Sequence, residues 1–315
     1  MREFQVTLPY DKKRVDSFLF DMIPNVNSSV IYKAFRKRNV KVNNKRVKES
    51  YVISQGDTVQ VFVPDEYLQG KASDGASTKD APKIIYEDDY ILVVSKPQGM
   101  PVHEDRNDDV QILDKWVQKT AGESGKTYEQ GFPALCHRID RNTGGLVLFA
   151  KDPETLAVLE DKFRNREIRK IYHCLVYGVP LRKSGELHGY LRKDSKNSRV
   201  FVYDRPVKGA DPIITRYRVL KAFDGYSLLE VELVTGKTHQ IRAHLAFIGH
   251  PILGDGKYGI NSVNRTFKLK WQALWAYEMT FMFTSPSGHL SYLDGKTVTL
   301  PDIKWERGLS QTVFA

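Results

Sequence analysis

The chain has 315 residues, and its 48 lysines and arginines outnumber its 38 aspartates and glutamates to give a formal net charge of +10. This length accommodates about two domains with cores of their own, and the excess positive charge favours a polyanionic partner such as nucleic acid. Cys136 and Cys174 are the only cysteines and lie far apart, which argues against a disulfide scaffold or a zinc site. No stretch is long and apolar enough to span a bilayer, and Met1 to Val6 lacks the apolar core of a signal peptide. We therefore predict a cytoplasmic protein that uses neither a membrane nor a metal.

Residues 1–64 have the pattern of a small α/β domain. Apolar residues at helical spacing predict a first helix that ends at Pro24-Asn25, namely Val15, Phe18, Leu19 and Met22. Ser28 or Ser29 can cap a second helix with Ile31, Ala34 and Phe35 on its inner side. Alternating valines on either side of an Asn43-Asn44 turn then predict a small sheet, namely Val40, Val42, Val47, Val59, Val61 and Val63.

This pattern resembles the alpha-L RNA-binding domain found in a ribosomal small-subunit protein and in many RNA-modifying enzymes. The resemblance implies that the basic residues contact RNA phosphates and so supply affinity and salt dependence rather than sequence readout. The alternative is a solvated charged helix face, but the turn motifs favour RNA. The predicted contact residues are Arg14, Lys33, Arg36, Lys37, Arg38, Lys41 and Lys45.

Residues 65–82 contain glycine, serine and threonine with hardly any large apolar residue, which predicts a flexible linker. From residue 83 to residue 315 the pattern is rich in strands. Helices are expected at about 110–120, 153–166 and 239–248.

The most informative stretch runs from Cys136 to Lys151 and carries one carboxylate, Asp140, between Arg138 and Arg141 in a short polar turn. Asn142, Gly144 and Gly145 supply the backbone freedom of a tight turn, and Leu146 to Ala150 reads as a strand buried on both faces. The two arginines favour the charged carboxylate, which suits a nucleophile or cation stabiliser better than a proton donor. The plainer interpretation is a turn residue in a surface ion pair.

The stretch resembles the signature of the RluA-type pseudouridine synthases, His-Arg-Leu-Asp-x-x-Thr-Ser-Gly-Leu, with Ile139 and Gly144 as departures. Three further blocks agree in order and spacing. Ile168 to Gly178 is similar to the family's Lys-x-Tyr strand, Thr235 to Leu245 to its Gly-Arg-Thr-His-Gln-Ile-Arg block, and Val94 to His103 to the opening of its catalytic domain. The resemblance covers about residues 84 to 301.

The resemblance implies an α+β fold with a mixed, mainly antiparallel sheet in the catalytic domain. It implies that Asp140 is the indispensable carboxylate, that Arg242 pairs with it, and that Tyr172 faces the target base, where it could stack on uracil and help to remove the C5 proton. Arg138 matches the residue that fills the space vacated by a flipped nucleotide. We assign further substrate contacts to Arg141, Lys170 and Ile241.

The implied reaction breaks the bond from ribose to N1 of uracil, rotates the base and rejoins it through C5. No redox change or outside group is needed, so we predict no cofactor. Asp140 could attack the sugar, add to C6 of the base, or stabilise an ion-like sugar, and the sequence leaves all three open. Base flipping into a dry pocket is required.

Alternatives remain for the target and for the activity. Large-subunit rRNA is favoured over tRNA, and the protein is expected to be a monomer. Other possibilities are an RNA-binding ribosome-assembly factor with an idle site, and an RNA glycosidase, although the latter normally needs two carboxylates. Gly254 to Gly259 spells G-x-G-x-x-G, but neither a leading strand nor a following amphipathic helix accompanies it, which argues against dinucleotide binding. Trp275 stands where many relatives carry histidine, and the sequence gives no reason for it.

Overall fold

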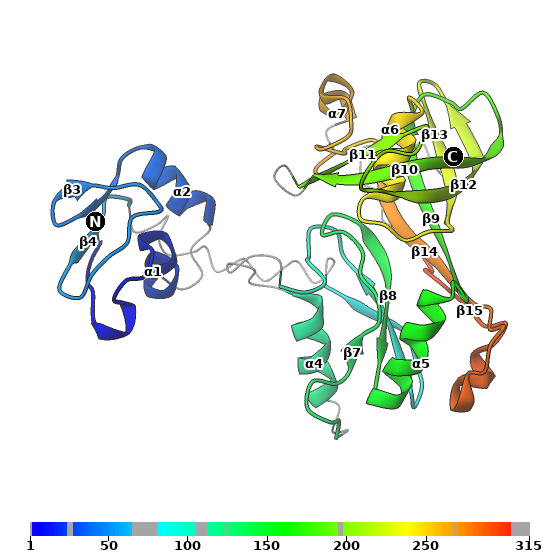
Figure 1. The fold of residues 1–315 in the computed structure, drawn as a ribbon, viewed down its shortest axis with the longest axis horizontal. Helices are drawn as coiled ribbons and strands as arrows, with labels where there is room; N and C mark the ends of the chain where they lie inside the picture. Colours follow the sequence, from blue (N-terminus) through cyan, green and yellow to red (C-terminus); the bar gives the residue numbers. More distant parts are fainter. Residues whose placement is uncertain are drawn as a thin grey trace. The chain divides into compact units, whose positions relative to one another are not determined.

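The chain divides into two compact units, one reaching up to Ala81 and the other starting at Pro82 (Figure 1). The computed structural model describes residues 2–23, 28–64, 81–104, 112–123, 125, 127–194, 198–267 and 269–303. Apart from residues 81 and 82, the predicted linker lies outside this range, as does the predicted helix end at Pro24-Asn25. Each unit is described by itself below.

The first unit packs two helices against a small sheet with strand order β1-β4-β2-β3. Its elements are β1 (Arg2–Gln5), a 3-10 turn (Leu8–Tyr10), α1 (Val15–Met22), α2 (Ser28–Arg36), β2 (Val40–Val42), β3 (Lys45–Arg46) and β4 (Thr58–Val61). The predicted helical stripes are confirmed, since Val15, Phe18, Leu19 and Ile31 are fully buried in its core. Asn43 and Asn44 both have positive φ, as a two-residue hairpin turn requires. The β1 strand was not predicted.

The second unit is built on a mixed sheet of eleven strands among its described residues. They are β5 (Lys83–Glu87), β6 (Ile91–Lys96), β7 (Ala134–Leu135), β8 (Gly144–Ala150), β9 (Ile168–Tyr177), β10 (Ser184–Asp194), β11 (Arg199–Tyr203), β12 (Ala210–Phe223), β13 (Tyr226–Leu233), β14 (Leu274–Phe281) and β15 (Thr297–Thr299). The order is β11-β10-β12-β13-β9-β14-β8-β6-β5, with β15 on β14 and β7 on β8. Among these pairings only β14 with β8 is parallel, so the predicted α+β class with a mainly antiparallel sheet is confirmed.

The described helices of this unit are α4 (Leu113–Glu123), α5 (Pro153–Arg164), α6 (Gln240–Phe247) and α7 (Asn261–Phe267), with a 3-10 helix at Gly288–Leu293. The first three correspond to the predicted helices. We did not predict α7, which buries none of its residues and therefore lacks the apolar stripe that sequence patterns reveal. In Figure 1, α4 and α5 accompany β7 and β8, while α6 lies with β10 to β12. No helix in the described ranges is long and apolar enough to cross a membrane.

The parallel pairing of β8 with β14 joins the two halves of the sheet, and two glycines make it possible. A Cβ on Gly145 would lie 2.2 Å from the carbonyl oxygen of Ala276, and φ at Gly145 is +107°. A Cβ on Gly144 would lie 2.5 Å from the ring of Trp275. Trp275 is buried at this crossing, opposite Gly144 in the register. The indole therefore occupies the space that a larger residue at position 144 would need.

Candidate active site

Asp140 lies in the loop that joins β7 to β8, and buried hydrogen bonds fix the backbone of this loop. The ammonium group of Lys96, which is fully buried, donates to the carbonyl oxygens of Pro97, Met100 and Arg141 at 2.7–3.0 Å. The amide of Thr143 donates to the carbonyl of Asp140 at 3.0 Å. Burial lowers the pKa of Lys96 to about 7. These bonds hold the loop through its backbone and do not involve the side chain of Asp140.

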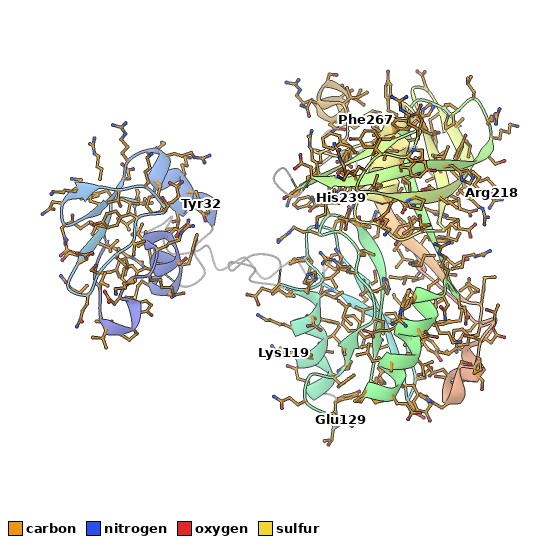
Figure 2. The ribbon with its side chains drawn as sticks, viewed as in Figure 1. Tyr32, Lys119, Glu129, Arg218, His239 and Phe267 are labelled. Carbon is orange, nitrogen blue, oxygen red and sulfur yellow. The ribbon has the colours of Figure 1, made fainter. Side chains whose placement is uncertain are left out.

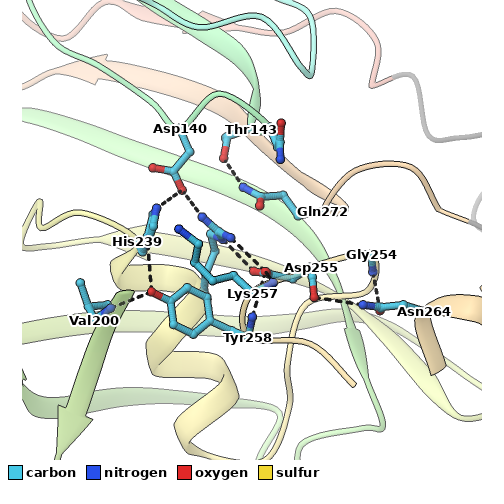
Figure 3. A network of polar contacts seen from close by, with 12 residues as sticks. Asp140, Thr143, Val200, His239, Gly254, Asp255, Lys257, Tyr258, Asn264 and Gln272 are labelled. Carbon is cyan, nitrogen blue, oxygen red and sulfur yellow. Dashed lines mark hydrogen bonds and ion pairs between the residues drawn. The ribbon is translucent and has the colours of Figure 1, made fainter. Parts of the chain in front are cut away.

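One guanidinium, that of Arg242 on α6, holds two carboxylates (Figure 3). Its Nη1 donates to Asp140 Oδ2 at 2.9 Å, while Nε and Nη2 donate to Asp255 Oδ2 and Oδ1 at 2.7 and 2.9 Å. The predicted pairing of Arg242 with Asp140 is therefore present. This guanidinium comes from a helix about a hundred residues away along the chain. Nη1 of Arg138 instead lies 3.0 Å from Nε2 of His103.

The two carboxylates differ in exposure and in saturation. The side chain of Asp255 is fully buried, and its Oδ1 also accepts from the amides of Lys257 and Tyr258 at 2.8 and 3.1 Å. The side chain of Asp140 is 25% exposed, and Oδ1 makes no hydrogen bond with any residue that the structure describes. Asp255 thus anchors the arginine, and Asp140 keeps an oxygen available for chemistry.

In the buried pair of Arg242 and Asp255, each residue stabilises the charged form of the other. Burial alone would lower the pKa of Arg242, but hydrogen bonds and attraction from Asp255, together with Asp140, raise it above its ordinary value. Burial alone would raise the pKa of Asp255, but the hydrogen bonds from Arg242 and from two backbone amides bring it below its ordinary value. The arginine and its anchor are therefore both charged at neutral pH.

Asp140 faces a cleft of about 780 Å³, a size within the range of small-molecule binding sites. The cleft is strongly basic, since eight lysines and arginines line it against three acidic residues. The basic residues are Arg138, Arg164, Arg166, Arg169, Lys170, Arg216, Lys237 and Arg242, and the acidic ones are Asp140, Asp211 and Glu232. A cleft of this charge attracts an anionic backbone.

Most of the site residues predicted in this unit line the same cleft. Tyr172, on β9, and Ile241, on α6, are buried in its wall, and Lys170 and Arg138 also border it. Burial, helped by the charge of Asp140, raises the pKa of Tyr172, and burial lowers the pKa of Lys170. Arg141 is not among the lining residues, and its carbonyl accepts from Lys96 and from the amide of Gly99.

Sequence reasoning missed three residues around Asp140. Nε2 of His239 lies 4.0 Å from Asp140 Oδ2, and Nδ1 of the same ring lies 2.9 Å from the hydroxyl of Tyr258. Asp255 is the third. Both Asp255 and Tyr258 belong to the Gly254–Gly259 segment, which its similarity to a family block of the form Gly-Asp-x-x-Tyr-Gly predicted to lie near the active site, but neither residue was assigned a role. The pairing of a buried aspartate with a distant arginine leaves no periodic signal, so no local pattern reveals it.

The basic residues predicted to bind RNA in the first unit lie mainly at its surface. Lys33, Arg36, Lys37, Arg38 and Lys45 are exposed and Lys41 is half-buried. Tyr32 marks the exposed side of α2 in Figure 2. Arg14 differs, because its guanidinium donates twice to the buried Asp16, at 3.1 and 2.7 Å, and its charge is thereby balanced within the protein.

Comparison with known proteins decides the family. A family model described as RNA pseudouridylate synthase matches residues 90–247. The chain belongs to the RNA pseudouridine synthases. It is 35% identical over 255 residues to the ribosomal large subunit pseudouridine synthase C of Vibrio cholerae, covering 78% of this chain and 77% of the relative. It is 34% identical over 293 residues to an uncharacterized RNA pseudouridine synthase of Mycoplasma pneumoniae, covering 89% and 88%.

A solved structure agrees in fold. Human RNA pseudouridylate synthase domain containing 1 superposes with a TM-score of 0.53 at 22% identity, covering 74% of this chain and 94% of that one. The RluA-type resemblance is thus confirmed, and the enzyme is an isomerase that converts uridine in RNA to pseudouridine. The cleft that holds Asp140 lies for the most part within the matched residues.

Proposed function

We propose that this pseudouridine synthase modifies large-subunit ribosomal RNA and that Asp140 is its catalytic residue. The observation that carries the proposal is the Asp140 carboxylate, held by Arg242 with one oxygen unbonded among the described residues, in a cleft lined by basic residues. The name of the Vibrio cholerae relative supports the ribosomal target. Two free cysteines, Cys136 and Cys174, suit the reducing cytoplasm in which ribosomes are built.

The proposed chemistry needs a uridine turned out of its RNA into the cleft. In this proposal Arg138 fills the space that the nucleotide leaves, a role supported by its exposed position among the residues that line the cleft. Asp140 acts on the flipped uridine while the N1–C1′ bond breaks, uracil rotates, and the C5–C1′ bond forms. The C5 proton is lost and N1 gains a proton, so atoms balance without a cofactor. Tyr172 enters as a neutral phenol, because burial raises its pKa, and this form suits stacking on the base.

The first unit, with its exposed basic side chains, is proposed to bind flanking RNA. Its surface lysines and arginines attract phosphates without reading sequence. The catalytically idle alternative is disfavoured, because Asp140, Tyr172 and Arg242 are all present and line one cleft.

The test is Asp140→Asn, assayed by tritium release from large-subunit rRNA transcribed with uridine that carries tritium at C5. The amide keeps the shape of the side chain but loses the charge, so we expect release to fall by about 10⁴-fold or more while RNA binding persists. Normal release by this variant would refute the catalytic role. Transcribed tRNA, assayed in parallel, would reverse the assignment of the target if it alone released tritium.

A further inference from the structure

We propose that His239 is a positioning residue that holds Asp140 through an Nε2–H group whose tautomer is fixed by Tyr258. This inference rests on the proposed catalytic role of Asp140. Figure 3 shows the chain of contacts from Val200 through Tyr258 and His239 to Asp140. Each link has one chemically favoured direction.

The first link assigns the proton of the phenol. The amide of Val200 donates to the hydroxyl oxygen of Tyr258 at 2.9 Å. Among the described residues, Nδ1 of His239, 2.9 Å away, is the only acceptor that contacts the phenol, so the phenol proton points at it. Nδ1 therefore accepts, and a neutral imidazole that accepts at Nδ1 carries its proton on Nε2.

The second link reaches the same assignment from the other side. Nε2 faces Asp140 Oδ2 at 4.0 Å. An unprotonated Nε2 would turn a lone pair toward the carboxylate, which is repulsive, whereas an N–H group is attracted. At 4.0 Å this contact is too long for a hydrogen bond, but contacts of this kind commonly tighten when substrate fills a site.

The charges around the ring keep it neutral. Asp140 and Asp255 favour its protonation, whereas burial, Arg242 and Lys257 oppose it. Burial dominates, and the pKa of His239 falls to about 4. A neutral donor can orient the carboxylate without cancelling the negative charge that the reaction needs.

The backbone at His239 is held in a conformation that most residues avoid. His239 has φ +56°, the left-handed region, as the residue that precedes α6. Such strain persists where the surroundings enforce it. Here the side chain of Gln240 enforces it, since Oε1 accepts from the amide of Lys237 at 3.1 Å and Nε2 donates to the carbonyl of Ile214 at 3.0 Å. In Figure 2 His239 lies between the part of the unit with α6 and the part with β8.

Together with Arg242, His239 would bind Oδ2 of Asp140 and leave Oδ1 as the oxygen that reacts. The consequence is specific to turnover. Removing the ring should loosen the carboxylate and slow the chemical step, with little change in the affinity for RNA.

The first experiment compares His239→Gly, which relieves the left-handed backbone but has no donor, with His239→Gln, whose amide nitrogen can take the place of Nε2 and keeps an N–H donor. In the tritium-release assay we expect the glycine variant to lose roughly 100-fold in kcat, as a misplaced catalytic group does, with KM within about threefold of the parent. The glutamine variant should recover part of this loss. His188→Ala, at an exposed histidine on β10, is the matched control and should behave as the parent.

The second experiment reads the tautomer directly from the ¹⁵N shifts of the histidine rings, with the ring of His239 assigned in the parent protein through its own backbone resonances. We expect Nε2–H at neutral pH. In Tyr258→Phe, which removes the donor to Nδ1, the single tautomer should be lost and the pKa of His239 should rise by about one unit. Because it uses the parent protein and Tyr258→Phe, this measurement tests the inference even if the position-239 variants fold poorly in thermal melts.

A glycine variant with the parent's kcat, or an Nδ1–H tautomer, would overturn the inference while an inactive Asp140→Asn left the proposed function standing. An active Asp140→Asn would overturn both.

Discussion

Two loops of the second unit each bring one aspartate to Arg242, and the two aspartates differ in how they are bonded. The Gly254–Gly259 loop buries Asp255 completely and saturates it with two guanidinium bonds and two backbone amides. The loop between β7 and β8 leaves Asp140 a quarter exposed with a single guanidinium bond. The same residue type is structural in one loop and available for chemistry in the other, and the number of donors around it makes the difference.

The comparison also explains how a single arginine serves both functions. A guanidinium that a buried carboxylate already holds on one side loses little further side-chain entropy when it binds a second carboxylate. Asp255 therefore pre-orients Arg242, and Arg242 in turn fixes Asp140. Replacing either aspartate by asparagine separates the two contributions.

The largest expected loss of rate belongs to Asp140→Asn. The stability of this variant then distinguishes Asp140 from Asp255. We expect this variant to unfold within a few degrees of the parent despite its loss of turnover, because its side chain is partly solvated. Asp255→Asn should lose roughly 100-fold in rate through a misoriented arginine and also about 3 kcal/mol of stability through a broken buried pair. Urea unfolding measures the free energy of unfolding of both variants, and tritium release measures their rates. Equal loss of stability in the two would contradict the distinction.

The stability that Asp255 contributes should depend on pH. The pKa of Asp255 is lower in the folded protein than in the unfolded chain, where it is about 3.9. The folded state therefore gains stability above the unfolded value, and this gain is lost as the pH falls through the folded value. The gap in unfolding free energy between the parent and Asp255→Asn should be full at pH 7 and narrower at pH 3. A gap that is constant over this interval would show that the ion pair does not cause it.

Local sequence patterns predicted much of this fold, because the spacing of apolar residues shows which face of a helix or strand is buried in the core. The i, i+3, i+4 spacing of Val15, Phe18 and Leu19 gave α1, and the continuous apolar run to Ala150 gave β8. Neither α7 nor β1 has a fully buried face. Their sequences therefore lack such an apolar pattern.

The candidate site divides in the same way. The motif blocks pointed to Asp140, Tyr172 and Arg242, which the fold brings to one cleft. Asp255 and Tyr258 escaped prediction because their partners lie on other elements, at Arg242 and Val200. Hydrogen bonds between distant segments follow from the tertiary fold, and a single sequence contains no spacing that reports them.

A smaller effect is expected where Gly144 meets Trp275 beneath the Asp140 loop. Gly144→Ser places a Cβ against the indole, so we expect a loss of about 2 kcal/mol from overpacking. Trp275→His leaves a void and should also destabilise the protein. The double variant should be more stable than the sum of the two losses predicts, since the serine fills part of that void. Gly122→Ser, where a Cβ meets nothing within 4 Å, is the matched control. Simple additivity in urea unfolding would mean that the two positions are not coupled.

The smallest expected change in turnover concerns the first unit, whose charges are solvated rather than buried. Lys33→Gln combined with Lys37→Gln removes two exposed charges from the end of α2 and the turn that follows. If both bind phosphates, the slope of log affinity for rRNA against log salt should shrink by about one for each phosphate that is no longer neutralised. The rate at saturating RNA should stay unchanged, because neither residue belongs to the catalytic unit. Lys119→Gln, on the exposed face of α4 (Figure 2), is the control and should leave the slope as it is. An unchanged slope in the double variant would mean that this surface does not bind RNA, and that binding depends on the basic cleft around Asp140.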